Sequence, residues 1–324
     1  MSWMPYYRGT GKAPEVLPDL PPPPPWRAAR REGARGAART YLPAPGLVRA
    51  VNAALHLHRP LLVTGPAGSG KSTLIEQVAV EAGLGEVLRW HITSRSTLAD
   101  ALYRYDALGR IHAHNLGQRS RPAEESDIGQ FLELGPLGTA LLPRASDRPR
   151  ALLIDEIDKS DLDLPSDLLD VLERGSFEIP ELSRHPVREV RVRTAVSVPE
   201  GETGDDEMAT VTRGRVAGAA FPFIVMTSNG ERDFPAPFLR RCIRFDMPPL
   251  DKEVLASIVT AHLDSVEPDE GHLIAKFAER LDSKDHLAID QLLNAVLVLR
   301  DAGVADPDER DELRSLLLRE LGRA

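Results

Sequence analysis

The chain has 324 residues and a formal net charge of −9, with 42 % apolar and 27 % charged residues, which is the composition of an ordinary globular protein. Its length allows one large domain or two smaller ones. The single cysteine, Cys242, excludes an internal disulfide and predicts a reducing, cytoplasmic location. No apolar run is long enough to span a membrane, and no export signal is expected. The acidic balance argues against broad nucleic-acid binding without excluding it.

Residues 1–44 differ from the rest of the chain. They contain nine prolines, five of them consecutive at Pro21–Pro25, and seven basic against three acidic residues. Such a composition predicts a disordered arm with polyproline character. A docking arm for a partner or a neighbouring subunit is the alternative, and its anchors would be Trp3, Tyr6, Tyr7 and Trp26.

Buried strands and helices alternate from residue 45 to residue 249. The strand segments are, in chain order, PLLVTG, EVLRWHIT, RALLIDEID, FPFIVMTSN and CIRFDM, with helical segments such as KSTLIEQVAVEAGL between them. This alternation predicts an α/β domain, an αβα sandwich in which helices cover both faces of a parallel five-stranded sheet. The segment 191–218 predicts a hairpin with an acidic, flexible tip, whose expected role is contact rather than chemistry.

Residues 250–324 change character once more. The stretches KEVLASIVTAHL, EGHLIAKFAERL, AIDQLLNAVLVLRDAG and ERDELRSLLLREL all have the periodicity of amphipathic helices. We therefore expect a small all-helical domain after the α/β domain.

A glycine-rich segment, GPAGSGKST, follows the first strand and matches the pattern G-x-x-x-x-G-K-[ST]. Glycines let successive backbone N–H groups turn toward phosphate oxygens, and the helix that follows adds its positive dipole end. In such a P-loop, Lys71 reaches the β- and γ-phosphates and the Ser72 hydroxyl binds Mg²⁺. The predicted nucleotide-binding residues are Gly65, Pro66, Ala67, Gly68, Ser69, Gly70, Lys71, Ser72 and Thr73.

The strand RALLIDEID carries two adjacent acids, Asp155 and Glu156. Because side chains alternate along a strand, the two carboxylates are expected to point apart. Asp155 would hold Mg²⁺ through water, and Glu156 would polarise an attacking water as a general base. Two residues just beyond them, Asp158 and Lys159, are expected to lie at the surface or in a subunit contact.

These motifs resemble those of the AAA+ ATPases. GPAGSGKST, LLIDEID and VMTSNGERDFPAPFLRRC have the order and spacing of that family, and the resemblance covers residues 45–324. The flanking stretches LGPLGTALL and DLLDVLERGSFEI are similar to those of the MoxR-like branch, close to the dynein-related type. The resemblance implies the P-loop NTPase fold with a helical lid, ATP and Mg²⁺ as cofactors, and a homo-oligomeric, hexameric ring. It also implies a protein partner to be remodelled, often one with a von Willebrand factor A domain.

The resemblance also assigns residues near the strand FPFIVMTSN, which is expected to lie beside the acidic strand. Asn229 matches the sensor-1 position, where a polar side chain helps to place the attacking water beside Glu156; an Asn-Gly turn is the alternative. Arg241, with Arg240 as second choice, matches an arginine finger that acts in a neighbouring subunit's site, and pairing with surface acids is the alternative. Asp290 stands where many relatives carry the sensor-2 arginine, so no lid residue is assigned.

Two tyrosines, Tyr103 and Tyr105, lie in a segment that in this branch often projects toward the centre of the ring. They are expected either to pack against the sheet or to grip a substrate. Zinc is not expected, because no metal-ligand spacing relates His91, His112, His114 and Cys242.

Three functions fit this sequence. The first is a chaperone-like ring ATPase that remodels or activates a protein. The second is the NTPase motor of a nucleic-acid translocase or of a restriction-type defence system, and the third is a nucleotide-dependent switch that rarely turns over. Glu156 beside Asp155 favours hydrolysis over a switch, and an acidic chain without a basic stripe favours a protein partner over nucleic acid.

Overall fold

A computed structural model describes most of the chain. The described residues are 24, 41–66, 68–117, 128–144, 148–196, 208–218, 220–263, 265, 268–282, 289–301 and 316. The expected N-terminal arm lies almost entirely outside them, as does the fourth helix expected near the C-terminus. The acidic tip of the expected hairpin, residues 197–207, also lies outside them.

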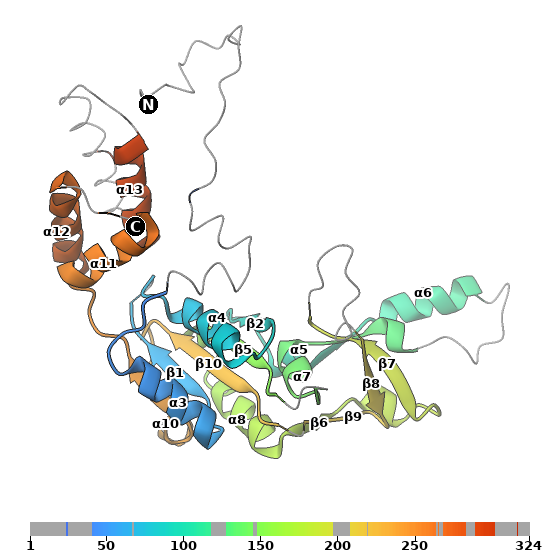
Figure 1. The fold of residues 1–324 in the computed structure, drawn as a ribbon. Coiled ribbons are helices and arrows are strands. Elements are labelled where there is room, and N and C mark those ends of the chain that lie inside the picture. The colour runs from blue at the N-terminus through green and yellow to red at the C-terminus, as the bar shows by residue number, and fades with distance from the viewer. Residues whose placement is uncertain are drawn as a thin grey trace, which may run out of the picture. The chain divides into compact units, whose positions relative to one another are not determined.

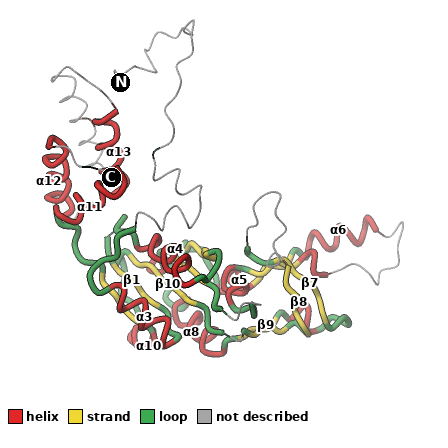
Figure 2. Tube along the Cα trace, viewed as in Figure 1, coloured by secondary structure: helices red, strands yellow, loops and turns green. Residues whose placement is uncertain are grey.

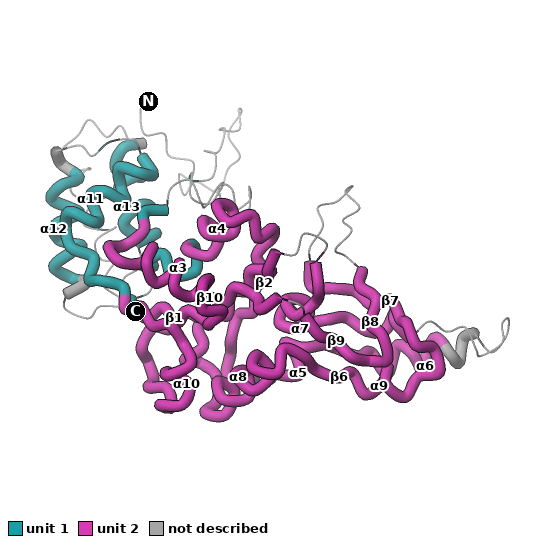
Figure 3. The backbone as a smooth tube through the Cα atoms, turned by 60° about the horizontal axis from the view of Figure 1, so that its bottom comes forward, with its two compact units in different colours: residues 1–42, 65–73, 247–324 teal, residues 43–64, 74–246 magenta. Residues whose placement is uncertain are grey.

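The chain divides into two compact units (Figure 3). One unit comprises residues 43–64 and 74–246 and contains two β-sheets. The other comprises residues 1–42, 65–73 and 247–324 and contains the P-loop segment and a group of helices.

The core sheet has five strands in the order β11-β1-β10-β5-β2, and all neighbouring strands are parallel (Figures 1 and 2). The expected α/β fold with a parallel five-stranded sheet is confirmed. The central strands are mostly apolar because both of their faces are covered, and every residue of β10 is buried. The strands are β1 (Leu61–Thr64), β2 (Val87–His91), β5 (Ala151–Asp155), β10 (Phe223–Ser228) and β11 (Ile243–Asp246).

Helices cover both faces of this sheet. In Figure 1, α4 lies on one side of the sheet, and α8 and α10 lie on the other. The buried residues of α8 recur at helical spacing, as with Leu164, Leu168 and Leu172, so one side of the helix faces the core. The helices are α3 (Leu47–Leu57), α4 (Lys71–Ala82), α8 (Leu164–Arg174) and α10 (Ala236–Arg241).

The strand register aligns the carboxyl ends of four strands at one edge of the sheet. Ser228 at the end of β10 pairs with Thr64 of β1, and His91 at the end of β2 pairs with Asp155 of β5. In open parallel sheets, ligands bind outside this edge. The register therefore gathers the acidic pair and the end of β10 where a site is expected.

A second sheet, of which the sequence predicts only one hairpin, has six strands in the order β3-β4-β7-β8-β9-β6. β7 and β8 form that hairpin, with Val190 opposite Val211. Buried valines alternate with exposed residues along β7, so one face of the strand packs and the other faces water. The strands are β3 (Tyr103–Tyr105), β4 (Leu132–Leu134), β6 (Ser176–Glu178), β7 (Glu189–Arg193), β8 (Met208–Thr212) and β9 (Arg215–Ala217).

Short helices connect the strands of both sheets. They are α5 (Leu98–Leu102), α6 (Ala107–Gly117), α7 (Pro136–Ala140), α9 (Pro180–Ser183) and the 3-10 turns η2 (Ile128–Phe131) and η3 (Ile157–Lys159). One apolar core joins the two sheets, because side chains from both contribute to it, including Leu152 of β5 and Val192 of β7.

In the other unit, three helices pack around a separate apolar core that includes Leu255, Phe277 and Leu292. They are α11 (Lys252–Leu263), α12 (Pro268–Asp282) and α13 (Ile289–Asp301), and they confirm three of the four expected amphipathic helices. The domain boundaries expected after residues 44 and 249 stay predictions. None of the helices that the structure describes is both long and apolar enough to cross a bilayer.

Candidate active site

The P-loop segment joins β1 to α4, and all its expected residues except Ala67 are described. Gly70 has a φ of 82°, in the left-handed region that glycine adopts without strain. A Cβ at this position would lie 2.8 Å from the ring of Tyr41, so Gly70 also leaves room for a close neighbour. The Ser69 hydroxyl donates to the Pro66 carbonyl at 2.9 Å and closes the loop on itself.

Lys71, the expected phosphate ligand, is buried and contacts its own loop. Its ammonium donates to the carbonyls of Gly65 and Pro66 at 2.6 and 2.7 Å, which keeps the buried charge hydrogen-bonded. Ser72 and Thr73 follow in the first turn of α4, where helical N–H groups point out of the helix. The loop therefore has the backbone form and the cation that phosphate binding needs, and the contact with phosphate stays a prediction.

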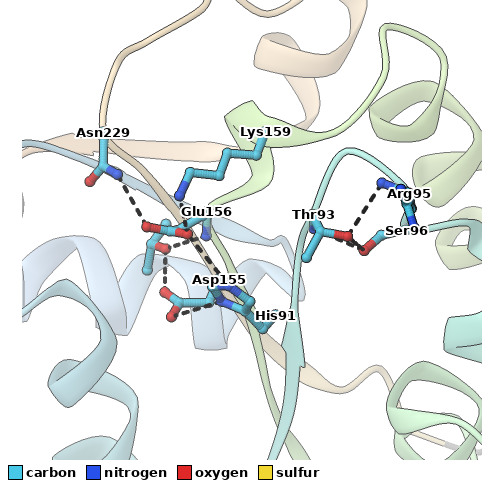
Figure 4. Close-up of polar contacts among 9 residues, drawn as sticks. His91, Thr93, Arg95, Ser96, Asp155, Glu156, Lys159 and Asn229 are labelled. Atoms are coloured by element: carbon cyan, nitrogen blue, oxygen red, sulfur yellow. Dashed lines mark hydrogen bonds and ion pairs between the residues drawn. The ribbon is translucent and has the colours of Figure 1, made fainter.

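The acidic pair sits at the end of β5, where one hydroxyl links its two members (Figure 4). The Thr227 Oγ1 donates to Asp155 Oδ1 at 2.6 Å and accepts the backbone N–H of Glu156 at 2.9 Å. Glu156 has a φ of 61°, a left-handed conformation that costs free energy in a residue with a Cβ. Thr227 thus fixes the backbone at the point where the chain turns sharply out of the strand.

Three side chains surround the Glu156 carboxylate (Figure 4). The Asn229 amide donates to Oε1 at 3.4 Å, and the Lys159 ammonium donates to Oε2 at 2.7 Å. His91 Nε2 lies 3.6 Å from the same Oε2, and His91 Nδ1 lies 3.8 Å from Asp155 Oδ2. The hydrogen bond with Glu156 raises the pKa of Lys159 above its ordinary value, so this ammonium is charged at neutral pH. The structure therefore brings Glu156 and Asn229 together, and the roles expected for them stay predictions.

The expectation that Asp158 and Lys159 lie at the surface or in a subunit contact is wrong for Asp158. This carboxylate is only 4 % exposed, and its Oδ2 accepts the backbone N–H groups of Asn229 and Glu231 at 2.9 and 3.1 Å. Lys159 is partly exposed, but its ammonium points back to Glu156. The cause is the turn η3, which folds the chain back after β5, so that Asp158 meets the backbone that follows β10 and Lys159 meets Glu156.

The arginine pair occupies the last turn of α10, and both side chains are exposed. Arg241 forms an ion pair with Glu173 of α8, which is the alternative that the sequence left open. Arg59 donates to the main-chain carbonyls of Arg240 and Arg241 and so holds the end of this helix. Both partners of the Arg241–Glu173 pair are about half exposed, so the pair contributes little stability and leaves Arg241 available to other partners.

The two tyrosines of β3 pack within the second sheet. The Tyr103 hydroxyl donates to Glu181 at 2.9 Å, and its ring stacks on Phe177 at a centroid distance of 6.5 Å. Burial, together with the bond to Glu181, raises the pKa of Tyr103 to about 12. The Tyr105 hydroxyl accepts a hydrogen bond from Arg110 at 3.0 Å. These contacts favour packing over the substrate-gripping alternative.

Sequence reasoning missed the parts played by His91, Thr227, Asp158 and Lys159 around the acidic pair. For His91 and Thr227 a signal existed, since both are polar residues in the last positions of strands whose carboxyl ends meet at one edge of the sheet. For Asp158 and Lys159 no comparable signal existed, because their directions depend on the left-handed conformation of Glu156.

Asp155 and Ser72 each carry the kind of oxygen donor that Mg²⁺ prefers, an ion usually held by one or two protein groups together with substrate phosphates. Asp155 supplies a partly exposed carboxylate at the end of β5, and Ser72 supplies a hydroxyl in the first turn of α4. In the described part of the chain, no group of three or more His, Cys, Asp or Glu residues is placed to hold a metal ion.

Comparisons with known proteins give only distant likenesses. A scan against protein-family models and a search of curated proteins each find no match. Among solved structures, NtrX from Brucella abortus in complex with ATP is 16 % identical with a TM-score of 0.46, over 92 % of this chain and 59 % of the NtrX chain. NtrX in complex with ADP is 14 % identical with a TM-score of 0.39, over 87 % and 56 %.

A single-substitution variant of RuvB from Thermotoga maritima is 13 % identical with a TM-score of 0.42, over 83 % of this chain and 66 % of that one. The chain thus spans between 56 % and 66 % of the length of these proteins. Likeness at this level carries no argument about activity, which depends on the geometry above.

Proposed function

We propose that this chain is an ATPase of the AAA+ type that hydrolyses ATP at the carboxyl edge of the core sheet. The observation that carries the proposal is the position of Glu156, whose carboxylate accepts a hydrogen bond from Asn229 at the end of the neighbouring strand and shares His91 as a neighbour with Asp155. Phosphoryl transfer to water requires a general base, a magnesium ligand and a polar group that positions the water. This chain has a residue for each of these roles, together with a complete P-loop.

In the proposed reaction, Lys71 exchanges the carbonyls of its own loop for the outer phosphate oxygens. Ser72 and Asp155 would hold Mg²⁺, which neutralises phosphate charge when bound. Glu156 takes a proton from the attacking water, and Asn229 orients that water. Arg241, or Arg240 in second place, stabilises the charge on the transferred group in a neighbouring subunit's site.

The finer parts of the proposal are supported by the motif resemblance alone. They are a MoxR-like, chaperone-like mode of action, a hexameric ring and a protein partner with a von Willebrand factor A domain. A cytoplasmic location is proposed from the single cysteine, Cys242. The ring is linked to the chemistry, because an arginine acting in trans requires a neighbouring copy of the chain.

The test compares wild type with Glu156→Gln, using Glu178→Gln as the control because Glu178 is an exposed glutamate of β6. The amide keeps the shape of Glu156 but cannot take up a proton. We expect ATP turnover to fall about 100- to 10,000-fold in Glu156→Gln while a fluorescent ATP analogue still binds. Turnover near the wild-type rate would contradict the general-base assignment, and absence of turnover in wild type would contradict the ATPase proposal.

One observation bears on the nucleic-acid alternative. The second sheet exposes arginines that the sequence did not place together: Arg191 and Arg193 on β7, and Arg215 on β9. Exposed glutamates lie beside them, Glu189 on β7 and Glu133 of β4 opposite Arg193, so the face is mixed in charge and suits a protein better than a polyanion. Strong stimulation of ATP turnover by DNA or RNA, lost with increasing salt, would instead support the translocase.

A further inference from the structure

Asp158 is a buried carboxylate for which the mechanism above has no use. Its Oδ1 has no hydrogen-bond partner among the described residues, and its Oδ2 accepts two backbone N–H groups. A buried charge with one bare oxygen costs free energy, whereas the two N–H groups need only an acceptor oxygen, which a neutral asparagine also carries. The position of the two donors suggests what the charge does instead.

Both donors belong to the turn that follows β10. They are the N–H groups of Asn229 and Glu231, and Ser228 Oγ accepts the N–H of Gly230 between them at 3.0 Å. Bonds to a carboxylate are about twice as strong as neutral ones, so Asp158 fixes this turn more firmly than an uncharged acceptor could.

The ends of β5 and β10 thereby hold each other reciprocally. Thr227 of β10 accepts the N–H of Glu156, and Asp158, three residues after β5, accepts the N–H of Asn229. The backbones that carry the Glu156 carboxylate and the Asn229 amide are therefore each fixed by a side chain from the other segment. The 3.4 Å contact between these two groups depends on both links.

We propose that Asp158 is a positioning residue for hydrolysis, which acts by holding the backbone of Asn229 so that its amide meets Glu156. This inference rests on the proposed ATPase function. It assigns the Asp158 charge to orientation of the water-positioning amide rather than to the binding of nucleotide, metal or a neighbouring subunit. Loss of the acceptor should therefore lower kcat and leave nucleotide affinity unchanged.

The experiment uses the full chain with Asp158→Ala, Asp158→Asn and the control Asp161→Asn. Asp161 lies in the same loop, and its Oδ1 accepts the N–H of Leu164, a capping role that asparagine performs equally well. We expect kcat to fall about 10- to 100-fold in Asp158→Ala, since small misplacements of catalytic groups have effects of that size. Asp158→Asn should recover most of the loss because its amide oxygen still accepts, and Asp161→Asn should match wild type.

A double-mutant cycle with Asn229→Ala separates positioning from general stability. If Asp158 acts through Asn229, Asp158→Ala should lower kcat no further once Asn229 is alanine. The proposal would be overturned if the double variant lost kcat by the product of the two single losses. It would also be overturned if Asp158→Ala alone kept the wild-type kcat. If Asp158→Ala does not fold, the cycle is run with Asp158→Leu, which keeps more of the side-chain volume but also removes the acceptor, and the same two outcomes decide.

Hydrogen exchange supplies a readout that does not depend on turnover. In Asp158→Ala, the amides of Asn229 and Glu231 should exchange faster than in wild type or Asp158→Asn, while those within β10 keep their protection. Unchanged exchange at the turn would overturn the inference even if wild type hydrolyses ATP. Faster exchange in Asp158→Ala, combined with a wild type that does not hydrolyse ATP, would support the role of Asp158 in holding the turn. It would contradict only the proposed ATPase function.

Discussion

The carboxyl edge of the core sheet and the second sheet use polar residues in opposite ways. At the edge, hydrogen bonds join the side chain of Thr227 to Asp155 and that of Asn229 to Glu156, and Thr227 also accepts the backbone N–H of Glu156. In the second sheet, charged residues of β7 alternate outward to water while its valines fill the core. Parallel strands bring their ends to one edge, whereas an antiparallel sheet spreads its polar side chains over a face. We therefore expect substitutions at the edge to change turnover and substitutions in the second sheet to change stability.

The largest expected effect would come from a residue in neither region. Arg241→Ala should bind ATP normally but hydrolyse it about 1,000- to 100,000-fold more slowly, the range for loss of an arginine finger. Mixed with Lys71→Ala protein, it should regain partial turnover, because an intact P-loop in one subunit then receives the arginine of its neighbour. Glu173→Gln is the control, since it removes the partner of Arg241 and keeps the guanidinium.

Mixed assemblies that form but stay inactive would contradict action in trans. Full activity of Arg241→Ala alone would move the role to Arg240 or remove it. Either result would mean that no neighbouring subunit contributes Arg241 to catalysis. The chemistry would then depend on the sheet edge and the P-loop of a single chain, which would sharpen the contrast between the sheet edge and the second sheet.

The sequence predicts the core sheet well because its central strands β1, β5 and β10 are apolar runs, two of which lead into a turn-forming glycine or asparagine. The acidic pair Asp155 and Glu156 was predicted from its position at the end of such a run, whereas Asn229 was assigned through the motif resemblance. The second sheet was largely missed because its strands are short and pair over long separations: β3 pairs with β4 and β4 with β7, without a turn motif between them. Asp158 was misplaced for a different reason, since a single left-handed residue, Glu156, decides where it points.

Thr227→Val tests the edge directly, because valine keeps the β-branched shape and removes the hydroxyl. The substitution leaves the N–H of Glu156 and Oδ1 of Asp155 without this link. We expect kcat to fall about 10- to 100-fold and unfolding free energy to fall by about 1–3 kcal/mol. Thr210→Val, at an exposed position of β8, should change neither. Equal effects of the two substitutions on kcat would break the comparison between the regions.

Lys159→Met should have a smaller effect in the opposite direction. The Lys159 ammonium engages Oε2 of Glu156, one of the two oxygens that can accept the water proton. Its removal should raise turnover up to about fivefold, the range for a partly exposed ion pair. Lys252→Met, an exposed lysine of α11, is the control.

The pH dependence of turnover provides a second check on Lys159. Because the Lys159 pKa is raised above its ordinary value, the ion pair with Glu156 persists through neutral pH. It weakens only when the pH rises through the raised pKa of Lys159. Wild-type turnover should therefore rise in the alkaline range toward that of Lys159→Met, whose profile lacks the rise. Lower turnover in Lys159→Met at every pH would show that the ammonium supports the reaction.

Tyr103→Phe gives the smallest expected effect and tests the second sheet. The substitution removes one hydrogen bond, to Glu181, and keeps the ring on Phe177, so unfolding free energy should fall by about 0.5–1.5 kcal/mol in denaturant titrations. The raised pKa adds a pH signature: below pH 10 the hydroxyl is neutral in both states, and from about 10 to 12 only the unfolded chain loses its proton. The stability advantage of wild type over Tyr103→Phe should therefore disappear across that pH window.

ATP turnover of Tyr103→Phe should equal that of wild type in both the presence and the absence of a partner, because the hydroxyl serves packing. A selective loss of partner-stimulated turnover would instead support a substrate-gripping role for this tyrosine.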